Sequence, residues 1–196
     1  MYQITKRLAD IFASLILIVL ASPIWLIVSF LLKISGEGRV FYVQPRIGFK
    51  NHPFGIWKFS TMVEGSPKME TKDYTLRDDP RVTRVGKYLR CTKINEFPQV
   101  INVLKGEMSW VGPRPLMKRS FDRYSPFVRD RIYDVLPGIT GIGSVIFRDE
   151  EELLARSEMD SDEFYRRVIN PYKGQLELWY IENQSLSTDL LILFLT

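Results

Sequence analysis

Four residues in one stretch of the chain have the types and spacing that phosphate chemistry requires. Lys93, Asn95 and Glu96 lie within one short segment, and Arg114 follows in the turn formed by residues 111–115. A carboxylate can serve as nucleophile, base or metal ligand, and lysine and arginine bind phosphate oxygens. These residues are our candidates for a site that binds a phosphorylated molecule.

The element that must position them is predicted to be a short helix. Apolar residues within 97–104 recur at i, i+3, i+4 and i+7, which predicts one buried helix face. Asn95 is a favourable N-cap, and Gly106 stands where a helix C-terminal stop belongs. Free backbone N–H groups and the positive end of the helix dipole would stabilise an anion at this N-terminus. The alternative interpretation is a capped surface helix with a polar first turn and no ligand.

Composition narrows the classes of function. The 196 residues are enough for one domain with a core, and 27 basic against 23 acidic side chains give a net charge of +4. This mild excess suits work near anionic lipid or phosphorylated substrates, and we expect no nucleic-acid partner. Cys91 is the only cysteine, which excludes an intrachain disulfide and a cluster of thiolate metal ligands. His52 is the only histidine and lies in a polar turn, which speaks against a Ser-His-Asp triad.

An apolar run near the N-terminus indicates a membrane segment. Residues 11–32 are almost wholly apolar, which meets the length of about 20 residues expected for a membrane helix. Ser22-Pro23 interrupts the run near its middle, where proline removes a backbone donor and bends a helix. Basic residues flank the run on both sides: Lys6 and Arg7 before it, Lys33 and Arg39 after it. The positive-inside rule keeps both flanks cytoplasmic, so we predict a re-entrant helix; a proline-kinked transmembrane helix remains the alternative.

The rest of the chain predicts an α+β fold that is mostly helical. Residues 40–43 and 54–59 have the composition of short strands, with a turn at 44–48 between them. Residues 64–80 are polar and rich in turn signals, which predicts a surface loop. Helices are predicted over four later stretches, at 82–90, 121–135, from 150 onward and through 179–180. The apolar end of the chain, residues 186–196, could lie on a bilayer surface or fill the core.

The order of several motifs along the chain is more specific than any one of them. The motifs are Ser22-Pro23, Gln44-Pro45-Arg46-Ile47-Gly48, Trp57-Lys58-Phe59-Ser60-Thr61-Met62, the run from Asn102 to Pro115, and Pro137-Gly138-Ile139-Thr140-Gly141. In this order they resemble the bacterial sugar transferase family, the monotopic phosphoglycosyl transferases, in the small form that consists of the catalytic domain alone. The resemblance covers nearly the whole chain.

The resemblance implies a reaction and a location. Such enzymes move a sugar-1-phosphate from a UDP-sugar to polyprenol (undecaprenyl) phosphate and release UMP, in the first membrane step of bacterial glycan and exopolysaccharide synthesis. The implied cofactor is Mg²⁺ and the implied partners are membrane lipids. The resemblance is also compatible with a homodimer. The implied place is the cytoplasmic face of the bacterial inner membrane. Residues 1–35 would form a re-entrant membrane helix broken at Ser22-Pro23, and residues 36–196 a cytoplasmic catalytic domain with interfacial amphipathic helices.

The chain departs from the family pattern at the position of the expected nucleophile. Family members carry an Asp-Glu pair in which the aspartate attacks phosphorus, whereas this chain has Asn95 followed by Glu96. Gly141-Ile142-Gly143-Ser144 also replaces the usual Gly-Trp-Ala-Gln, and Leu136 stands where arginine often precedes Pro-Gly. Three interpretations stay open. In the first, Glu96 or a carboxylate from residues 149–151 is the nucleophile. In the second, the sugar-phosphate passes directly between the substrates, with Glu96 as base or metal ligand. In the third, the protein is inactive and only binds lipid or nucleotide-sugar.

We favour an active enzyme, with the following assignments. Glu96 is the catalytic carboxylate and Asn95 a polar residue of the site. Substrate phosphate would be bound by Arg114 and Lys93, together with Lys58 and Arg46 from the motifs that carry the resemblance. Glu96 and Asp149 are the candidate ligands of Mg²⁺, and Asp149 and Glu150 are candidate auxiliary acids.

Overall fold

The computed structural model describes residues 1–35, 38–63 and 79–196. It is mostly helical with two small two-stranded sheets, which confirms the predicted α+β class. The chain forms two compact units. The first unit comprises Met1–Leu8, Arg46–Phe54 and Gly106–Thr196, and the second comprises Ala9–Pro45 and Gly55–Lys105. This division concerns packing only, so the predicted boundary between membrane segment and catalytic domain at residue 35 stays a prediction.

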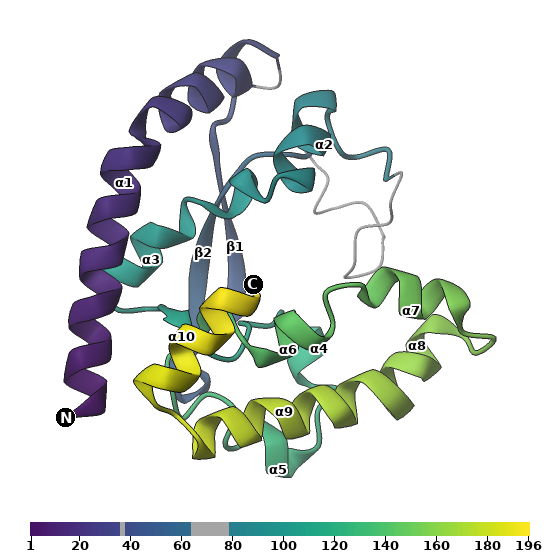
Figure 1. Ribbon diagram of the computed structural model, residues 1–196. Helices are drawn as coiled ribbons and strands as arrows, with labels where there is room; N and C mark the ends of the chain where they lie inside the picture. The colour runs from purple at the N-terminus through teal and green to yellow at the C-terminus, as the bar shows by residue number, and fades with distance from the viewer. Residues whose placement is uncertain (36–37, 64–78) are drawn as a thin grey trace. The chain divides into compact units, whose positions relative to one another are not determined.

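The apolar N-terminal run forms one helix, α1 (Tyr2–Ser35), which continues through Pro23. Proline at this position leaves the Val19 carbonyl without its usual N–H donor, and the Ser22 hydroxyl donates to that carbonyl at 2.8 Å. Figure 1 shows α1 as a single ribbon that bends in its later part. The helix therefore bends, but it is not interrupted at Ser22-Pro23. The re-entrant path through a bilayer stays a prediction.

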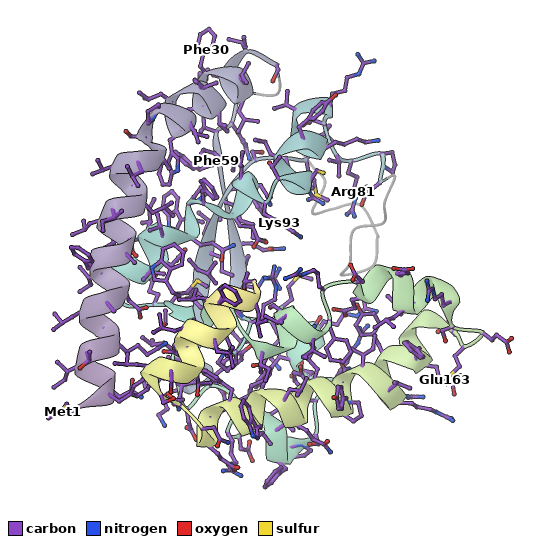
Figure 2. All side chains as sticks on the ribbon, in the orientation of Figure 1. Met1, Phe30, Phe59, Arg81, Lys93 and Glu163 are labelled. Carbon is purple, nitrogen blue, oxygen red and sulfur yellow. The ribbon has the colours of Figure 1, made fainter. Side chains whose placement is uncertain are left out.

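Most of the apolar surface of α1 is not covered by the chain itself. The helix is long and apolar enough to cross a membrane, and only 17% of its most hydrophobic 18-residue window is buried. Phe30, for example, is 64% exposed, whereas Phe59 of the same unit is 1% exposed (Figure 2). An apolar helix that the chain leaves uncovered indicates association with a membrane.

The second unit holds two short helices and most of both strands of a β-hairpin, whose turn, within residues 46–54, belongs to the first unit. Strand β1 (Phe41–Ile47) pairs with β2 (Pro53–Phe59) across η1 (Phe49–Asn51), so the turn lies beyond the predicted residues 44–48. Helices α2 (Arg84–Cys91) and α3 (Gln99–Lys105) follow, with the 3₁₀ turn η3 (Ile94–Glu96) between them. The core of this unit consists of Val28, Leu32, Phe59 and Leu89, with Trp25 and Val85 packed against it. Most of the predicted loop 64–80 lies outside the described residues.

The first unit is organised around a parallel pair of short strands, β3 (Ser109–Val111) and β4 (Gly138–Thr140). The predicted helix at 121–135 is wrong, because Ser125 and Pro126 start a new helix there. The helices of this unit are α4 (Lys118–Phe121), α5 (Pro126–Arg129), α6 (Ile142–Ile146), α7 (Glu150–Arg156), α8 (Ser161–Phe164), the π-helix η4 (Tyr165–Ile169), α9 (Asn170–Glu182) and α10 (Leu186–Leu195).

A buried polar network attaches the start of α1 to α10 within the first unit. The Lys6 ammonium lies 2.6 Å from the Asp189 carboxylate, and the Tyr2 hydroxyl donates to the same carboxylate at 2.9 Å. Tyr180 from α9 donates to Asp189 at 2.7 Å. Because these groups are paired with one another, their burial is compensated. The first turns of the apolar helix are thereby fixed to the C-terminal helices.

Candidate functional site

The structure brings together two of the charged residues singled out from the sequence. Lys58 lies on β2 and Glu96 ends η3, and the Lys58 ammonium is 3.2 Å from the Glu96 carboxylate. Their side chains are only 16% and 18% exposed. A pair this well shielded from water is worth more electrostatically than a surface pair, and each member holds the other in place.

Asn102 fixes the strand that carries Lys58. Its side-chain amide donates to the Gly55 carbonyl at 2.7 Å, and its amide oxygen accepts the Trp57 N–H at 3.0 Å. The side chain is fully buried in α3 and bonds to β2 as a neighbouring strand would. Because Lys58 follows Trp57 directly, Asn102 sets the position from which the ammonium meets Glu96. Sequence reasoning did not identify this residue.

The predicted helix start at Asn95 is wrong. Helix α3 begins at Gln99, and Asn95 lies inside the preceding 3₁₀ turn. The backbone N–H of Glu96 bonds to the Lys93 carbonyl at 3.0 Å, and that of Phe97 to the Ile94 carbonyl at 3.1 Å. These N–H groups therefore do not form the predicted anion site. Pro98 accounts for the difference, since it stands one residue before the helix, where its fixed φ suits helix entry.

The C-terminal stop of the helix is confirmed, but its buried face differs from the predicted one, since Phe97, Ile101 and Leu104 are only half-buried. Gly106 follows α3 with a φ of +82°, a conformation that favours glycine. Val100 belongs to the predicted apolar face and is fully buried, but so are Asn102 and Val103 beside it. The spacing rule missed these two because α3 is enclosed on more than one side.

Asn95 and Lys93 occupy different environments. Asn95 is 8% exposed, and its amide oxygen is buried without a hydrogen-bond partner among the described residues. Lys93 is exposed and has a left-handed backbone with a φ of +59°. Figure 2 labels its position in the second unit. An unsatisfied buried oxygen is costly in a folded protein, so the Asn95 amide oxygen is a group that a ligand could satisfy.

The second unit holds further cations, and one of them, Arg90, lies close enough to Glu96 for their charges to interact. The Arg90 side chain donates from Nε to the Thr61 hydroxyl at 2.9 Å. Burial lowers the pKa of Arg90, while the negative charges of Asp79 and Glu96 raise it. Arg81 binds Asp79 through Nη2 at 2.5 Å, and this hydrogen bonding lowers the pKa of the Asp79 carboxyl to about 2. Asp79 therefore stays negative beside these arginines at any physiological pH.

Arg114 lies in a Pro-Arg-Pro turn, residues 113–115, in the first unit. Because proline has no N–H, the Arg114 amide is the only backbone donor within this turn. The Tyr133 hydroxyl donates to the Arg114 carbonyl at 2.9 Å and accepts the Leu116 N–H at 2.9 Å. Burial raises the pKa of this hydroxyl, so it remains protonated and able to donate.

Other bonds complete the attachment of the turn. They join Gly112 N–H to Thr140 O (2.9 Å), Gly138 N–H to Pro113 O (2.9 Å), Arg46 Nη1 to Pro115 O (3.4 Å) and Ile47 N–H to Leu116 O (2.8 Å). The backbone that carries Arg114 is therefore fixed by its neighbours on several sides. Arg46, a predicted phosphate ligand, lies against this turn and supports its backbone.

The predicted acidic candidates lie at the start of α7 in the first unit. Asp149 is exposed at the N-cap position without a side-chain capping bond. Glu150 is 3.0 Å from the ammonium of Lys173 on α9. Among the residues that the structure describes, no group of three or more His, Cys, Asp or Glu side chains is placed to hold a metal ion. A metal at this site would therefore need further ligands from a substrate.

Two sets of candidate residues result. Lys58, Glu96, Asn95 and Lys93 belong to the second unit, where Glu96 meets Lys58. Arg46, Arg114, Asp149 and Glu150 belong to the first unit, where Arg46 bonds to the turn of Arg114. Each set combines charge with buried polar support, which is the composition expected of a site for phosphorylated ligands.

The sequence was compared with known proteins. A family model described as bacterial sugar transferase matches residues 1–196. The chain is 36% identical to an undecaprenyl-phosphate glucose phosphotransferase of Komagataeibacter xylinus, over 99% of this chain and 35% of the relative. It is also 36% identical to a UDP-glucose:undecaprenyl-phosphate glucose-1-phosphate transferase of Klebsiella pneumoniae, over 99% of this chain and 39% of the relative.

A shorter relative is matched over most of its length. The exopolysaccharide production protein ExoY of Sinorhizobium fredii is 31% identical, over 98% of this chain and 84% of the relative. The chain thus spans less than half the length of the two phosphotransferases above. Since the family model covers the whole chain, the resemblance read from its motifs is confirmed: the chain belongs to the bacterial sugar transferase family.

Proposed function

We propose that this protein transfers a sugar-1-phosphate from a UDP-sugar to undecaprenyl phosphate and releases UMP. The names of the two phosphotransferase relatives describe this reaction or part of it. The observation that carries the proposal is the shielded pair of Lys58 and Glu96 beside Asn95, at the position where the family resemblance implies catalytic residues.

Glu96 can act by either of two routes. As a nucleophile, its carboxylate attacks the sugar-proximal phosphorus and the bond to the bridging oxygen breaks, so that UMP leaves with that oxygen. Undecaprenyl phosphate then attacks the same phosphorus and releases the carboxylate. In the direct route the acceptor phosphate itself attacks the phosphorus, UMP leaves with the bridging oxygen, and Glu96 acts as base or metal ligand. In both routes the Lys58 ammonium holds the carboxylate in place.

Arginine and lysine supply the binding of phosphate. The guanidinium of Arg114 presents paired N–H donors that match phosphate oxygens, and the fixed backbone of its turn limits the orientations that it can adopt. Lys93 is exposed and supplies a mobile positive charge. Each of them would offset negative charge on a phosphate group that it binds.

Mg²⁺ fits the oxygen donors of the second unit. Glu96 offers a carboxylate, and the buried Asn95 amide oxygen has no partner among the described residues. Mg²⁺ is usually held by one or two protein oxygens together with substrate phosphates, so a small protein donor set is sufficient. When bound, the ion would neutralise diphosphate charge. Asp149 remains a predicted further ligand.

The protein is proposed to sit in the cytoplasmic leaflet of the inner membrane, with α1 entering and leaving on the same side. The uncovered apolar surface of α1 and the bend in its later part support this. Single cysteines replacing the exposed Gln3 and Ser35, in a Cys91→Ser background, should both react with an impermeant thiol reagent added to the cytoplasmic side. Labelling from opposite sides would establish a full span.

The proposal is tested with purified protein in nanodiscs, given undecaprenyl phosphate, Mg²⁺ and a panel of UDP-sugars. We expect UMP release with at least one donor, and a loss of about a hundredfold or more in Glu96→Gln. The control is Glu182→Gln, which alters an exposed carboxylate on α9. UMP release that survives Glu96→Gln unchanged would remove Glu96 from its role. Incubation with donor alone, followed by mass measurement, separates the routes, because only the nucleophilic route adds sugar-phosphate to the protein.

The second candidate is a membrane protein that binds a nucleotide-sugar or lipid without turnover. Asn95 favours it, because a neutral amide replaces the carboxylate that the resemblance implies. Calorimetry would then show donor binding with no UMP release, and Asn95→Asp would gain turnover. Turnover in the natural sequence decides for the enzyme.

A further inference from the structure

Glu177 is a buried carboxylate that neither the sequence analysis nor the proposed reaction uses. It lies on α9 in the first unit, and only 2% of it is exposed. Its oxygens face two glycines, Gly141 just before α6 and Gly143 in the first turn of α6. A Cβ built on Gly143 would lie 2.4 Å from Glu177 Oε1, and one built on Gly141 would lie 3.8 Å from Oε2. The carboxylate therefore occupies space that exists because residue 143 has no side chain.

The backbone amides of Arg114 and Gly143 donate hydrogen bonds to the Glu177 carboxylate. Its Oε2 atom is buried without a hydrogen-bond partner among the described residues, so both bonds go to Oε1. The bond from Arg114 has a particular consequence, because this amide is the only donor within the Pro-Arg-Pro turn. Tyr133 fixes the carbonyl side of the same residue at 2.9 Å. Glu177 and Tyr133 thus restrain Arg114 from its two backbone groups.

We propose that Glu177 is a positioning residue for Arg114: from the space left by Gly143 its carboxylate holds the Arg114 amide and so orients the guanidinium toward substrate phosphate. This inference rests on the proposed function for the role of the guanidinium, but not for the contact with the amide. A loosened Arg114 backbone would spread its side chain over more orientations and weaken the binding of phosphate.

Glutamate at 177 and glycine at 143 are matched in size. The family resemblance implies an alanine where this chain has Gly143, and a methyl group there would stand 2.4 Å from the Glu177 carboxylate. Such a distance requires one of the two groups to move. Aspartate at 177 is one methylene shorter and would withdraw from the methyl group. The pair therefore predicts a rescue: Gly143→Ala is harmful alone and tolerated together with Glu177→Asp.

The charges around Glu177 make its ionisation sensitive to pH near neutrality. Burial raises the pKa of Glu177 to about 7, while the charge of Lys173, the amides of Arg114 and Gly143 and the charge of Arg114 lower it. Glu150, which pairs with Lys173, and the buried hydroxyls of Tyr124 and Tyr133 are the other titratable groups nearby. Protonation turns one oxygen into a donor and weakens acceptance from the two amides. The restraint on Arg114 should therefore weaken as pH falls below about 7.

The first test measures the contact between Glu177 and the Arg114 amide and does not depend on enzymatic activity. Amide hydrogen exchange at Arg114 is followed by NMR in wild-type protein, Glu177→Gln and the control Glu182→Gln, at about pH 8, where the Glu177 carboxylate is ionised. We expect exchange at Arg114 to accelerate about tenfold in Glu177→Gln, because the amide NH₂ replaces part of the acceptor. The amides of Gly112 and Leu116, bonded to Thr140 and Tyr133, should change little. Unchanged exchange at Arg114 overturns the inference.

The second test measures how the loss of this contact changes the KM for the UDP-sugar. Steady-state UMP release should show a KM for the UDP-sugar raised about tenfold in Glu177→Gln, with a smaller change in kcat. In an Arg114→Lys background the same change should add little, since the guanidinium is already lost. Gly143→Ala should behave like Glu177→Gln, and Gly143→Ala/Glu177→Asp should recover most of the wild-type KM. The same increase in KM from Glu177→Gln in the wild-type and Arg114→Lys backgrounds would show that Glu177 has only a structural role. So would a double variant Gly143→Ala/Glu177→Asp that does not recover the wild-type KM.

The two tests separate this inference from the proposed function. If the wild-type protein releases no UMP with any donor, the function fails, while exchange at Arg114 still decides whether Glu177 holds the amide. If UMP is released but exchange at Arg114 does not respond to Glu177→Gln, the function stands and the positioning role falls.

Discussion

At the residue scale, the charged groups of the site depend on uncharged or buried neighbours. Lys58 meets Glu96 from a strand position that Asn102 fixes with two hydrogen bonds. A buried ion pair has paid a desolvation cost that only its partner compensates, so removal of one member leaves the other unfavourably placed. The pair is therefore sensitive to changes that surface pairs tolerate.

Lys58→Gln should reduce UMP release strongly. Without the ammonium at 3.2 Å, the Glu96 carboxylate loses the group that holds it. We expect kcat to fall about a hundredfold, in the range seen when one charged partner is removed from an enclosed polar site. The matched control is Lys118→Gln, because Lys118 pairs with Asp122 on the surface with 69% of its side chain exposed. A control loss as large as that of Lys58→Gln would contradict a special role for the pair.

Tyr133→Phe should weaken both the fold and the turn of Arg114. The substitution removes a hydroxyl that donates to the Arg114 carbonyl and accepts from Leu116, and leaves both groups short of a partner. An unsatisfied buried group costs about 1–3 kcal/mol, which should lower the melting temperature measured by differential scanning fluorimetry. The control is Tyr124→Phe in the same core cluster, since Tyr124 is not among the groups bonded to the turn. Equal losses in the two variants would mean that packing alone matters.

Sequence reasoning identified the charged residues and missed those that hold them. Glu96, Lys58 and Arg114 are conspicuous because motifs and charge mark them. Asn102 and Tyr133 bond to backbone groups 47 and 19 positions away in the chain, which no local pattern reports. Glu177 gave a usable signal. It shares a helical face with Leu178 and Ile181, where a lone carboxylate among apolar residues indicates a buried role.

At the element scale, periodicity predicted which segments are helical better than where they begin. The hairpin strands, α2 and α9 lie close to the predicted ranges. The start of α3 and the segment 121–135 were wrong, because Pro98 delays one helix and Pro126 begins another inside a range treated as continuous. Proline also shapes α1, where Pro23 removes a donor and the Ser22 hydroxyl takes over the freed carbonyl of Val19.

Pro23→Ala should favour a straight, membrane-spanning α1. Alanine restores the N–H donor to the Val19 carbonyl and removes the clash of the proline ring with the preceding turn. We expect part of the population to expose residues 3 and 35 on opposite sides of the membrane, measured by labelling single cysteines in a Cys91→Ser background. Ser29→Ala in the same helix serves as the control and should leave labelling unchanged. Identical labelling in Pro23→Ala and wild type would show that proline does not decide the path.

At the scale of the whole molecule, stability and site geometry make opposite demands on Glu177. The ionised carboxylate is the better acceptor for the Arg114 amide, yet burial makes ionisation costly and raises the pKa of Glu177 to about 7 from a model-compound value of 4.5. The folded protein therefore binds the proton more tightly than the unfolded chain. Proteins often retain such a destabilising group where function needs it.

Glu177→Gln should consequently stabilise the protein at alkaline pH while impairing its function. With a folded pKa of about 7 and an ordinary value of 4.5 in the unfolded chain, the favourable contribution of the protonated carboxyl is complete below pH 4.5. It is lost as pH rises between these two values and is absent above about pH 7. A permanently neutral glutamine avoids that loss, so the stability of the variant relative to wild type should rise from pH 5 to pH 8 by at most about 3 kcal/mol.

The measurement is a series of melting temperatures in detergent across this pH range, for wild type, Glu177→Gln and Glu182→Gln. A gain of about 3 kcal/mol corresponds to roughly 6–12 °C in a chain of this size. Glu182 is 58% exposed by side chain and should show no such trend. A difference between Glu177→Gln and wild type that stays constant with pH would mean that Glu177 is already ionised at low pH. The carboxylate would then hold the Arg114 amide at little cost to the fold, and the predicted weakening of that contact below pH 7 would be absent.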